Sequence, residues 1–579
     1  MGDRSPTTRV PVLVVGGGAA GLTAAVLLHQ LGVEFLLLNS REAASRLPRA
    51  HVINQRTMEV LDGIGVAGEV YRLGTPAANM THVGWYTGVS GRRIGVQELW
   101  GAGGHNPAWA AASPCRTANL PQHLLEELLL RECPPDRIRF GHRVTGVSQQ
   151  DGGVTVDVVA GTSSYTVEAD YVLACDGGRT IGPALGIPSE GVEEIARMVS
   201  VHFEADLSGV LADDEVLMRW LVRPETGVGV SLLPLGPDEW GTRSREWVLH
   251  LNETPDTPLS DEEARRELCS VLELPTPPTV HRIMRWTVGS TVAERFRDGR
   301  VFLLGDAAHR LPPTGGLGLN SAVQDAHNLV WKLAAVLRGD AGAELLDTYE
   351  DERKPVAAAN IHQAVQNAIG HLLIVQTLGM GPESDPAENA IALRRLDSGL
   401  PEDREFRDSV RQAFAAQAGE FDALNLEYGY TYASAAVVPD DSPEPDNPDP
   451  VRVYRPGTRP GSPLPHAWLE DPLGARVALG SLVRPGRWLL IAGEDDGWTE
   501  AARELGLPLD VVRIGQTRGD YLDPRSAWTA VRGTSAGGAV LVRPDRVVAW
   551  RCADAVADPA AALRAAFDAV TCRDVAIAR

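Results

Sequence analysis

The chain contains 579 residues, of which 44% are hydrophobic and 22% are charged. A chain of this length and composition buries a large core, which excludes whole-chain disorder, a collagen-like fibre and a small disulfide scaffold. Its 54 Lys and Arg against 76 Asp and Glu give a net charge of −22, which repels nucleic-acid phosphates and anionic lipid, so we expect no nucleic-acid and no membrane partner.

The first elements predict a nucleotide-binding β-α-β unit. RVPVLVV (9–15) is typical of a buried strand, residues 19–31 of an apolar helix, and EFLLL (34–38) of a second strand. The turn between the first strand and the helix fits G-x-G-x-x-G, with Gly16, Gly18, Ala20 and Gly21. In this pattern the glycines permit a tight turn, close approach of a pyrophosphate and close helix packing, and the helix N-terminus attracts phosphate.

The end of the second predicted strand leaves the identity of the nucleotide open. Asn39 stands where this fold usually has an acid, and its amide oxygen accepts a ribose hydroxyl without the charge of a carboxylate. Ser40 and Arg41 follow, and the guanidinium of Arg41 is compatible with a 2′-phosphate and therefore with NADP.

Two later segments place an acid beside glycine where a buried strand ends. YVLACDGGR (171–179) runs into Asp176 and Gly177, and VFLLGD (301–306) runs into Asp306. In open α/β sheets, ligands bind at the carboxyl ends of the strands. A carboxylate there is suited to accept hydrogen bonds from a sugar or polyol.

A glycine-rich loop follows the strand at 301–304 and leads into a helix predicted near residues 320–337. Gly315, Gly316 and Gly318 would let bare backbone N–H groups approach a flat electron-rich ring. The positive end of the helix would be aimed at the same ring.

The chain pattern predicts an α/β protein of three domains. Short strand-like runs between residues 199 and 284 indicate a mostly antiparallel layer inserted into the nucleotide-binding domain, and nine prolines between residues 437 and 465 indicate a semi-rigid linker. The expected divisions are the first part of the nucleotide-binding domain at 1–190, the inserted domain at 191–285, the second part with long helices at 286–400, a connecting region with the linker at 401–465 and a small α/β domain at 466–579.

The six cysteines are scattered, and no two form a C-x-x-C pair. Such cysteines are typical of buried thiols in a reducing compartment. We find no signal-peptide pattern, no apolar run long enough to span a membrane and no cluster with metal-ligand spacing. The sequence therefore predicts a cytoplasmic protein without a metal site.

Seven segments carry a family resemblance: PRAHVINQRTMEVL (48–61), NLPQHLLEELL (119–129), ACDGGR (174–179), GDAAHRLPPTGGLGLNSAVQDAHNLVWKL (305–333), TYEDERKPV (348–356), PLPHAWL (463–469) and GAVLVRPDRVVAWR (538–551). Through them the chain resembles the class A FAD-dependent aromatic hydroxylases of the phenol 2-monooxygenase and 2,4-dichlorophenol 6-monooxygenase type. The resemblance implies a Rossmann-like FAD-binding domain, an inserted antiparallel-sheet substrate domain and a thioredoxin-like C-terminal domain. It also implies a small aromatic substrate, O₂, NADPH or NADH as co-substrate, and oxygen transfer from a flavin C4a-hydroperoxide. We also expect a homo-oligomer.

The resemblance assigns part of the chain to the cofactor. It implies contacts with the ADP half of FAD, with its phosphates and ribityl chain, with the flavin ring and with the nicotinamide donor. In chain order these residues are Gly16, Gly18, Ala20, Gly21, Asn39, Ser40, Arg41, Arg49, Gln122, Asp176, Gly177, Arg179, Asp306, Gly316, Gly318, Leu319 and Asn320.

Three residues are candidates for the chemistry. His51 lies where the family has a functional acid and would contact the substrate hydroxyl, with ordering of a loop as the alternative. Pro313 would hold a rigid loop beside the flavin. Arg285, with Trp286, would line the substrate pocket, with a packing role as the alternative.

Three residues outside the candidate site are expected to have structural or surface roles. We expect His309 to be structural. Asp325 is interpreted as an acid on a helix face and Glu352 as a surface ion-pair partner.

Three other functions stay open on the sequence alone. The same fold supports a Baeyer–Villiger enzyme that inserts oxygen beside a ketone. Asn39 and Arg41 are compatible with a plain NADP-dependent dehydrogenase. A flavin-binding partner protein without catalysis, held together by its C-terminal domain, is the third alternative.

Overall fold

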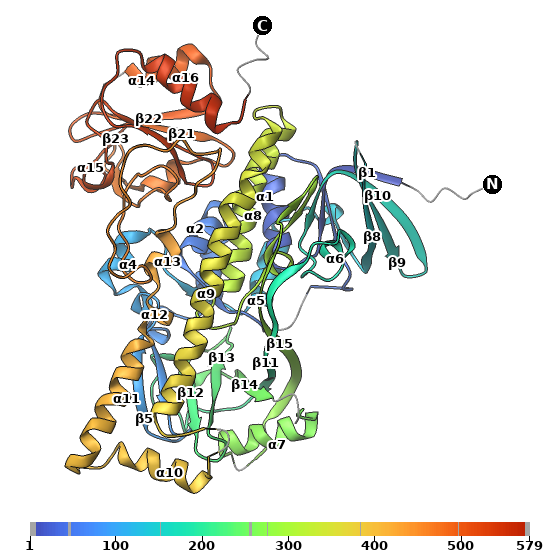
Figure 1. The fold of residues 1–579 in the computed structure, drawn as a ribbon, viewed down its shortest axis with the longest axis vertical. Helices are drawn as coiled ribbons and strands as arrows, with labels where there is room; N and C mark the ends of the chain where they lie inside the picture. Colours follow the sequence, from blue (N-terminus) through green and yellow to red (C-terminus); the bar gives the residue numbers. More distant parts are fainter. Residues whose placement is uncertain are drawn as a thin grey trace.

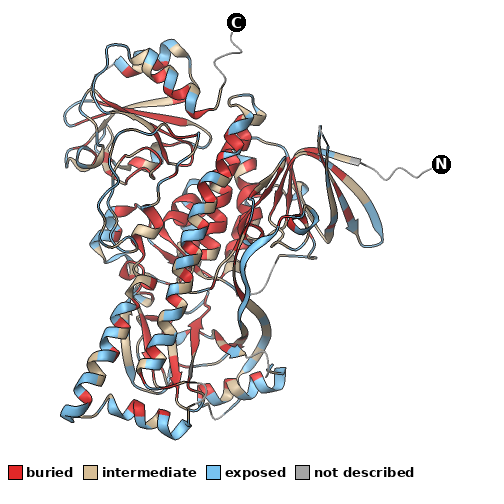
Figure 2. Ribbon diagram, viewed as in Figure 1, coloured by how far each residue is buried: buried red, intermediate tan, exposed pale blue. Residues whose placement is uncertain are grey.

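The structure is a computed structural model that describes residues 7–44, 48–150, 152–253, 258–274, 276–381, 384–495 and 497–573. Three large sheets lie around two long helices, α8 (Leu317–Leu337) and α9 (Thr348–Thr377), which run through the middle of the molecule (Figure 1). Buried residues are densest where α1 (Ala19–Gln30), α8 and the first sheet pack together (Figure 2).

The first sheet contains the predicted β-α-β unit. Its main strands follow the order β16-β17-β10-β1-β2-β7, and β1 pairs in parallel with both β2 and β10. The buried run at 171–174 is the end of a longer strand, β10, which continues without a break. The strands are β1 (Thr7–Val15), β2 (Phe35–Asn39), β7 (Ile138–Phe140), β8 (His142–Gln150), β9 (Gly153–Ala160), β10 (Ser163–Ala174), β16 (Arg297–Asp298) and β17 (Val301–Leu303).

The second sheet is mostly antiparallel, as predicted, but it is larger than residues 191–285. Its order is β18-β15-β11-β14-β13-β12-β4-β5, so two strands come from before residue 191 and β15 continues beyond residue 285. The β4–β12 pair is parallel because β4 joins the sheet from the first domain. The strands are β4 (His82–Tyr86), β5 (Arg93–Glu98), β11 (Ser189–Glu204), β12 (Val216–Arg223), β13 (Val228–Pro234), β14 (Glu246–Glu253), β15 (Thr279–Ala293) and β18 (His309–Arg310).

The two faces of β11 have different neighbours. Val199, Val201 and Phe203 are buried in a core with α7 (Asp261–Leu272). Side chains alternate between the faces of a strand, so Ser200 lies on the opposite face.

The third sheet belongs to the C-terminal domain and follows the order β20-β19-β23-β22-β21-β24-β25. Between Tyr428 and Trp468 the structure contains no helix or strand, which confirms the prediction of an irregular proline-rich connection. The strands are β19 (Trp468–Glu470), β20 (Arg476–Ala478), β21 (Trp488–Ala492), β22 (Leu509–Gly515), β23 (Tyr521–Leu522), β24 (Ala539–Val542) and β25 (Val548–Cys552).

The remaining helices surround these sheets (Figure 1). Within the described residues, none has the length and apolarity to cross a bilayer. They are α2 (Gln55–Gly63), α3 (Ala67–Leu73), α4 (Pro107–Ala112), α5 (Gln122–Arg131), α6 (Ile181–Ala184), α10 (Pro386–Arg395), α11 (Arg404–Ala416), α12 (Ala418–Phe421), α13 (Leu424–Tyr428), α14 (Gly497–Leu505), α15 (Ala527–Val531) and α16 (Pro559–Val570); a short two-stranded sheet joins β3 (Val52–Ile53) to β6 (Ala118–Asn119).

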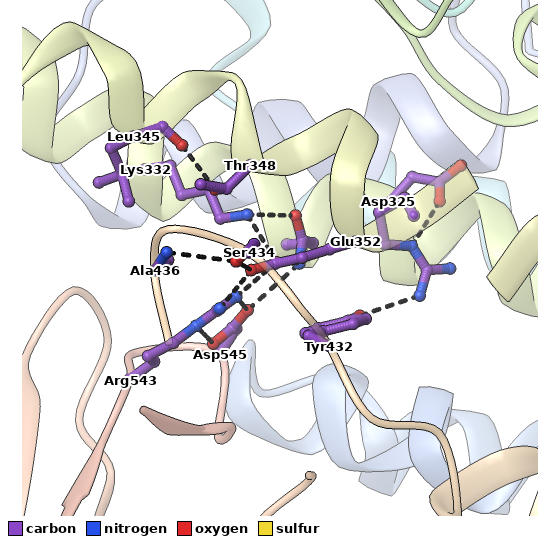
Figure 3. Close-up of polar contacts among 12 residues, drawn as sticks. Asp325, Lys332, Leu345, Thr348, Glu352, Tyr432, Ser434, Ala436, Arg543 and Asp545 are labelled. Atoms are coloured by element: carbon purple, nitrogen blue, oxygen red, sulfur yellow. Dashed lines mark hydrogen bonds and ion pairs between the residues drawn. The ribbon is translucent and has the colours of Figure 1, made fainter. Parts of the chain in front are cut away.

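A buried ion network joins the C-terminal domain to α8 and α9 (Figure 3). Glu352 on α9 accepts hydrogen bonds from Arg543 and from Lys332 of α8, and Arg543 also pairs with Asp545. The expectation that Glu352 is a surface residue is therefore wrong, since it is 1% exposed. A single sequence shows that α9 is a helix, but not which face the distant C-terminal domain covers.

Candidate active site

Three glycine turns from distant parts of the chain meet at the carboxyl ends of β1, β10 and β17. A Cβ atom on Gly16, which has φ +111°, would lie 2.1 Å from the carbonyl oxygen of Cys175. One on Gly178 would lie 3.3 Å from the carbonyl oxygen of Asp306, and one on Gly305 would lie 3.4 Å from Cβ of Ala20. At Gly16 only glycine allows so close an approach, and the positive φ values of Gly178 and Gly305 also favour glycine, so the three turns pack into one continuous surface.

Two helices begin at this surface with open N-termini. Gly18 precedes α1 and Gly316 precedes α8, and neither glycine has a side chain to cap its helix, although the carboxylate of Glu126 accepts a hydrogen bond from the amide of Ala19 in α1. A Cβ atom on Gly318 would meet nothing within 4 Å. The first amide groups of each helix therefore have no intrahelical partner and attract negative charge.

Arginines from three segments gather beside the first turn. Burial and the charges of Arg49 and Arg179 lower the pKa of Arg41, whereas the charge of Glu126 raises it. Arg49 and Arg179 are exposed. Three guanidinium groups within electrostatic range of one another form a site suited to an anion such as a pyrophosphate.

Glu126 on α5 is a buried acid of this site that sequence reasoning missed. Burial raises its pKa, while a 2.7 Å hydrogen bond from Gln122 and the charges of Arg41 and Arg49 lower it. The i, i+4 spacing of Gln122 and Glu126 in the sequence could have indicated this pair, because residues with that spacing are neighbours on a helix. The backbone amide of Gln122 also donates to the carbonyl of Ala50, which holds the segment around Arg49 against α5.

Asn39 and Asp176 use their side chains to order the local backbone. Oδ1 of Asn39 accepts a 3.2 Å hydrogen bond from the amide of Arg41. The carboxylate of Asp176 accepts from the amides of Gly178, Thr180 and Ile181 at 2.8–3.1 Å. Both residues lie at the strand ends where they were expected, and both shape the turns that surround the site.

Asp306 is exposed at the third turn, and a buried network behind it fixes that turn. Asp325 of α8 accepts hydrogen bonds from the amide of Gly305 at 3.1 Å and from Arg353 at 2.8 Å, and it contacts Nε2 of His309 at 2.7 Å. Burial by itself would raise the pKa of Asp325, but the charges of His309 and Arg353 lower it to about 2.

This network settles two of the structural expectations. Asp325 lies on a face of α8, as interpreted, and that face is buried, since Asp325 is 0% exposed. His309 is buried beside it and is structural, as predicted.

The start of α8 is tied to the segment that carries His51. Oδ1 of Asn320 accepts from the amide of Asn54 at 3.0 Å, and its Nδ2 donates to the carbonyls of Gly316 and Val52. Leu319 is buried, while Pro313 is exposed just before the helix. These bonds bring the segment at 48–61 beside the glycine loop.

His51 is held by Asn119, whose Oδ1 contacts Nδ1 of the imidazole. Burial lowers the pKa of His51, although the bond with Asn119 raises it. His250 of β14 lies within electrostatic range, because the charge that His51 would carry lowers the pKa of His250 further. Val52 of the same segment shares a core cluster with Val83 and Leu217 of the second sheet, so the segment at 48–61 lies against that sheet.

Arg285 does not share this face. It is paired in register with Val199, on the core side of the sheet, and its guanidinium donates to Asp261 of α7 at 2.8 Å. The expectation that Arg285 lines the pocket is therefore wrong: side chains alternate along β15, so its neighbour Trp286 takes the inner face. Trp286 donates to Ser200 at 2.9 Å.

The open helix ends, the arginine cluster and the exposed Asp306 fit a cofactor with a pyrophosphate, a polyol and a flat ring. Among the described residues, no group of three or more His, Cys, Asp or Glu side chains is arranged to hold a metal ion. The fold and the site together define an FAD-binding enzyme of the α/β class.

Comparisons with known proteins give the family. A family model described as an FAD binding domain matches residues 9–364, and one described as the C-terminal part of aromatic-ring hydroxylases matches residues 457–571. The 2,4-dichlorophenol 6-monooxygenase of Delftia acidovorans is 34% identical over 95% of this chain and 96% of its own length. Aklavinone 12-hydroxylase RdmE of Streptomyces purpurascens is 35% identical over 96% of this chain and 97% of its own length.

Solved structures agree with this result. The flavin-dependent monooxygenase PieE, in complex with FAD and substrate, superposes with a TM-score of 0.91 at 37% identity and covers 98% of this chain and 99% of its own. The chain therefore belongs to the family of FAD-dependent aromatic-ring hydroxylases, and it is an FAD-dependent monooxygenase.

Proposed function

We propose that this monooxygenase hydroxylates a phenol or a related hydroxylated heteroaromatic ring, with NADPH or NADH as electron donor and O₂ as oxygen source. The observation that carries the proposal is the position of His51, whose imidazole contacts Asn119 and whose neighbour Val52 is hydrogen-bonded to Asn320 at the start of α8. When bound, FAD supplies the activated oxygen that is transferred to the ring. The tasks of the protein are to bind and orient the ring, to exclude water and to move the hydroxyl proton.

The hydrogen bonds around His51 assign its protons. Nδ2 of Asn119 donates to Oγ1 of Thr75 at 2.7 Å, which leaves Oδ1 of Asn119 as the acceptor facing His51. Nδ1 of His51 must then carry the proton, and in the neutral ring Nε2 is an acceptor. Because burial lowers the pKa of His51, the neutral form prevails at neutral pH and serves as a base for a phenol.

We further propose that the expected cofactor residues hold FAD through the surface formed by the three turns. The amide groups at the start of α1, with Arg41, Arg49 and Arg179, fit the pyrophosphate, and the exposed carboxylate of Asp306 fits the ribityl hydroxyls. The start of α8 would stabilise negative charge on the reduced ring. The full set is Gly16, Gly18, Ala20, Gly21, Asn39, Ser40, Arg41, Arg49, Gln122, Asp176, Gly177, Arg179, Asp306, Gly316, Gly318, Leu319 and Asn320.

The test compares His51→Ala with the wild-type holoenzyme on a panel of phenols and hydroxypyridines. We expect His51→Ala to retain FAD while hydroxylated product per NAD(P)H consumed falls by about 10²- to 10⁴-fold, the usual worth of a general base. His362→Ala is the matched control, since His362 is an exposed histidine of α9. Unchanged coupled turnover in His51→Ala removes His51 from the mechanism.

The same panel, run under isotope-labelled O₂, separates ring hydroxylation from the Baeyer–Villiger alternative. Ring hydroxylation adds a labelled hydroxyl group, whereas insertion beside a ketone gives a labelled ester or lactone. Purified protein without a flavin spectrum would contradict the proposal and favour the dehydrogenase. Failure of every phenol to stimulate NAD(P)H oxidation would favour a non-catalytic flavin-binding partner.

We propose a homo-oligomer that associates through the outer part of α9. Ile369, Leu372 and Leu373 recur at i, i+3 and i+4 and are 41%, 62% and 52% exposed, which is unusual for side chains of this size on a monomer surface. Light scattering of wild-type and Leu372→Asp protein tests this: the variant should shift to the monomer mass, and an unchanged mass would contradict the assignment of this face.

We also propose a cytoplasmic location and a thioredoxin-like C-terminal domain with a packing role. All six cysteines are free, which supports a reducing compartment. The succession β21-α14-β22 followed by β24-β25-α16 supports the domain type, and the lack of a C-x-x-C pair leaves no thiol–disulfide chemistry. Retention of all thiols as free groups in protein purified without reductant tests the first point.

A further inference from the structure

We propose that His250 is a second imidazole of the substrate site, which donates a hydrogen bond from Nε2 to the substrate hydroxyl oxygen while His51 accepts the hydroxyl proton. This inference rests on the proposed ring hydroxylation and adds a second residue to its substrate site. It is carried by two chains of hydrogen bonds, one ending on each imidazole. They leave the two neutral rings as different tautomers, with the proton on Nε2 of His250 and on Nδ1 of His51.

The first chain fixes the tautomer of His250. Nε1 of Trp286 donates to Oγ of Ser200 at 2.9 Å, and an indole N–H is a donor only. Oγ of Ser200 lies 2.7 Å from Nδ1 of His250. Because Ser200 already accepts from Trp286 and makes no other side-chain bond among the described residues, its own proton is satisfied when it donates to Nδ1. His250 then carries its ring proton on Nε2.

The position of these residues in the sheet directs that Nε2 group to the inner side. Ser200 is paired in register with His250, and Met198 with Trp286, so all of these side chains lie on the face opposite the α7 core. The rings of His250 and Trp286 meet edge-on, with their centroids 6.4 Å apart. Among the described residues, Nε2 of His250 has no hydrogen-bond partner.

Both imidazoles are neutral near pH 7. Burial lowers the pKa of His250 to about 4, and the charge that His51 would carry if it were protonated lowers it further. Burial also lowers the pKa of His51. A neutral His250 with its proton on Nε2 is a donor, and a neutral His51 with its proton on Nδ1 offers an acceptor at Nε2.

A phenolic hydroxyl satisfies both groups, since it donates one proton and accepts at its oxygen. In the transfer step, the O–H bond of the substrate breaks and a bond forms between that proton and Nε2 of His51. The electron pair remains on the oxygen, which becomes a phenolate. The N–H of His250 then points at the new negative charge, and a hydrogen bond to a charged oxygen is stronger than one to a neutral oxygen.

The experiment measures the pKa of a phenol while it is bound. The probe is 4-fluorophenol, whose fluorine NMR shift reports its ionisation, titrated in the FAD holoenzyme. In His250→Phe the ring shape is kept and the N–H is lost. We expect the pKa of the bound phenol to rise by about one to two units relative to wild type, which is about a ten- to hundredfold loss of preference for the phenolate.

Two further variants separate the hydrogen bond from a general disturbance. His250→Gln carries an amide N–H near the place of Nε2 and should recover part of the effect. Ser200→Ala removes the group that fixes the tautomer and should give an intermediate rise, with FAD content unchanged. His202→Gln is the matched control, because His202 lies on the same face but its Nε2 contacts Glu246 at 2.7 Å.

The outcomes are distinct. An unchanged pKa of bound 4-fluorophenol in His250→Phe, in an enzyme that still hydroxylates phenols, overturns the role of His250 and leaves the proposed function intact. An equal rise in His202→Gln also overturns it, because the effect would not come from a hydrogen bond of His250. A wild-type holoenzyme that neither binds nor hydroxylates any phenol of the panel contradicts the proposed function itself, and this inference with it.

Discussion

Arg543 of the C-terminal domain and Glu352 of α9 form a fully buried ion pair in which two guanidinium nitrogens donate to the two carboxylate oxygens at 2.5 and 2.8 Å (Figure 3). The next residue on α9, Arg353, donates to Asp325, which in turn accepts from the amide of Gly305. Two consecutive residues of α9, Glu352 and Arg353, therefore connect the C-terminal domain to the glycine turn at Gly305.

Breaking the Arg543–Glu352 pair from one side should strongly destabilise the protein. Arg543→Ala leaves Glu352 and Asp545 buried without the cation they share, a change that costs about 3–5 kcal/mol for buried pairs. The midpoint of urea unfolding of the holoenzyme measures the loss. Arg72→Ala, which breaks an exposed pair with Glu69, is the control and should leave the midpoint nearly unchanged. Equal midpoints for wild type and Arg543→Ala would show that the network adds nothing to stability.

Gly318 and Gly16 should respond differently to alanine. At Gly318, on the first turn of α8, an added Cβ meets nothing within 4 Å, so Gly318→Ala should keep the thermal stability of the apoprotein and weaken FAD binding by blocking the ring. At Gly16, a Cβ atom would lie 2.1 Å from a carbonyl oxygen, so Gly16→Ala should lower both the thermal stability of the apoprotein and the affinity for FAD. Flavin titration of apoprotein and thermal unfolding without flavin provide the two readouts. Normal FAD affinity in Gly318→Ala would place the ring elsewhere.

The arginine cluster should contribute to cofactor affinity through charge. Arg179→Gln removes an exposed cation from the group around Arg41, and we expect about a tenfold weaker binding of FAD at low salt. The difference from wild type should shrink as salt is added, because exposed charges are screened. Fluorescence titration of apoprotein at two ionic strengths measures both effects. A salt-independent difference would mean that Arg179 acts through packing.

His466 should make the C-terminal domain sensitive to acid. Both of its ring nitrogens are buried and have no hydrogen-bond partner among the described residues, and burial lowers its pKa to about 4 from 6.5. Between pH 6.5 and pH 4 the unfolded chain binds a proton at His466 that the native state does not bind. The free energy of unfolding therefore decreases as the pH falls from 6.5 to 4. His466→Leu should therefore be more stable than wild type by an amount that grows over that window, to about 3 kcal/mol.

Urea unfolding of both proteins at a series of pH values tests this prediction. His29→Leu supplies a control at a histidine on the surface of α1. A stability difference between His466→Leu and wild type that stays constant with pH would show that His466 titrates normally.

Local pattern was enough to predict the β-α-β unit and the irregular proline-rich segment, because each depends on neighbouring residues. The same reasoning placed Arg285 in the pocket, whereas its neighbour Trp286 lies on that face of β15. A strand shows which residues alternate, but only the pairing of Val199 with Arg285 and the packing of α7 decide which set faces the core. Glu352 was misplaced on the surface for the same reason, and the burial of Asp325 was not foreseen, since the partners of both residues lie on other elements.

The amino-acid sequence by itself determined the FAD-binding class of this protein, since the glycine turns and strand ends that carry it are short motifs with fixed local geometry. Only the tertiary structure decided which side chains meet across the domains. The contact of His51 with Asn119, that of Ser200 with His250 and the ion pair of Arg543 with Glu352 join residues that are far apart in the chain. Such contacts follow from sheet register and helix packing, which no local pattern encodes.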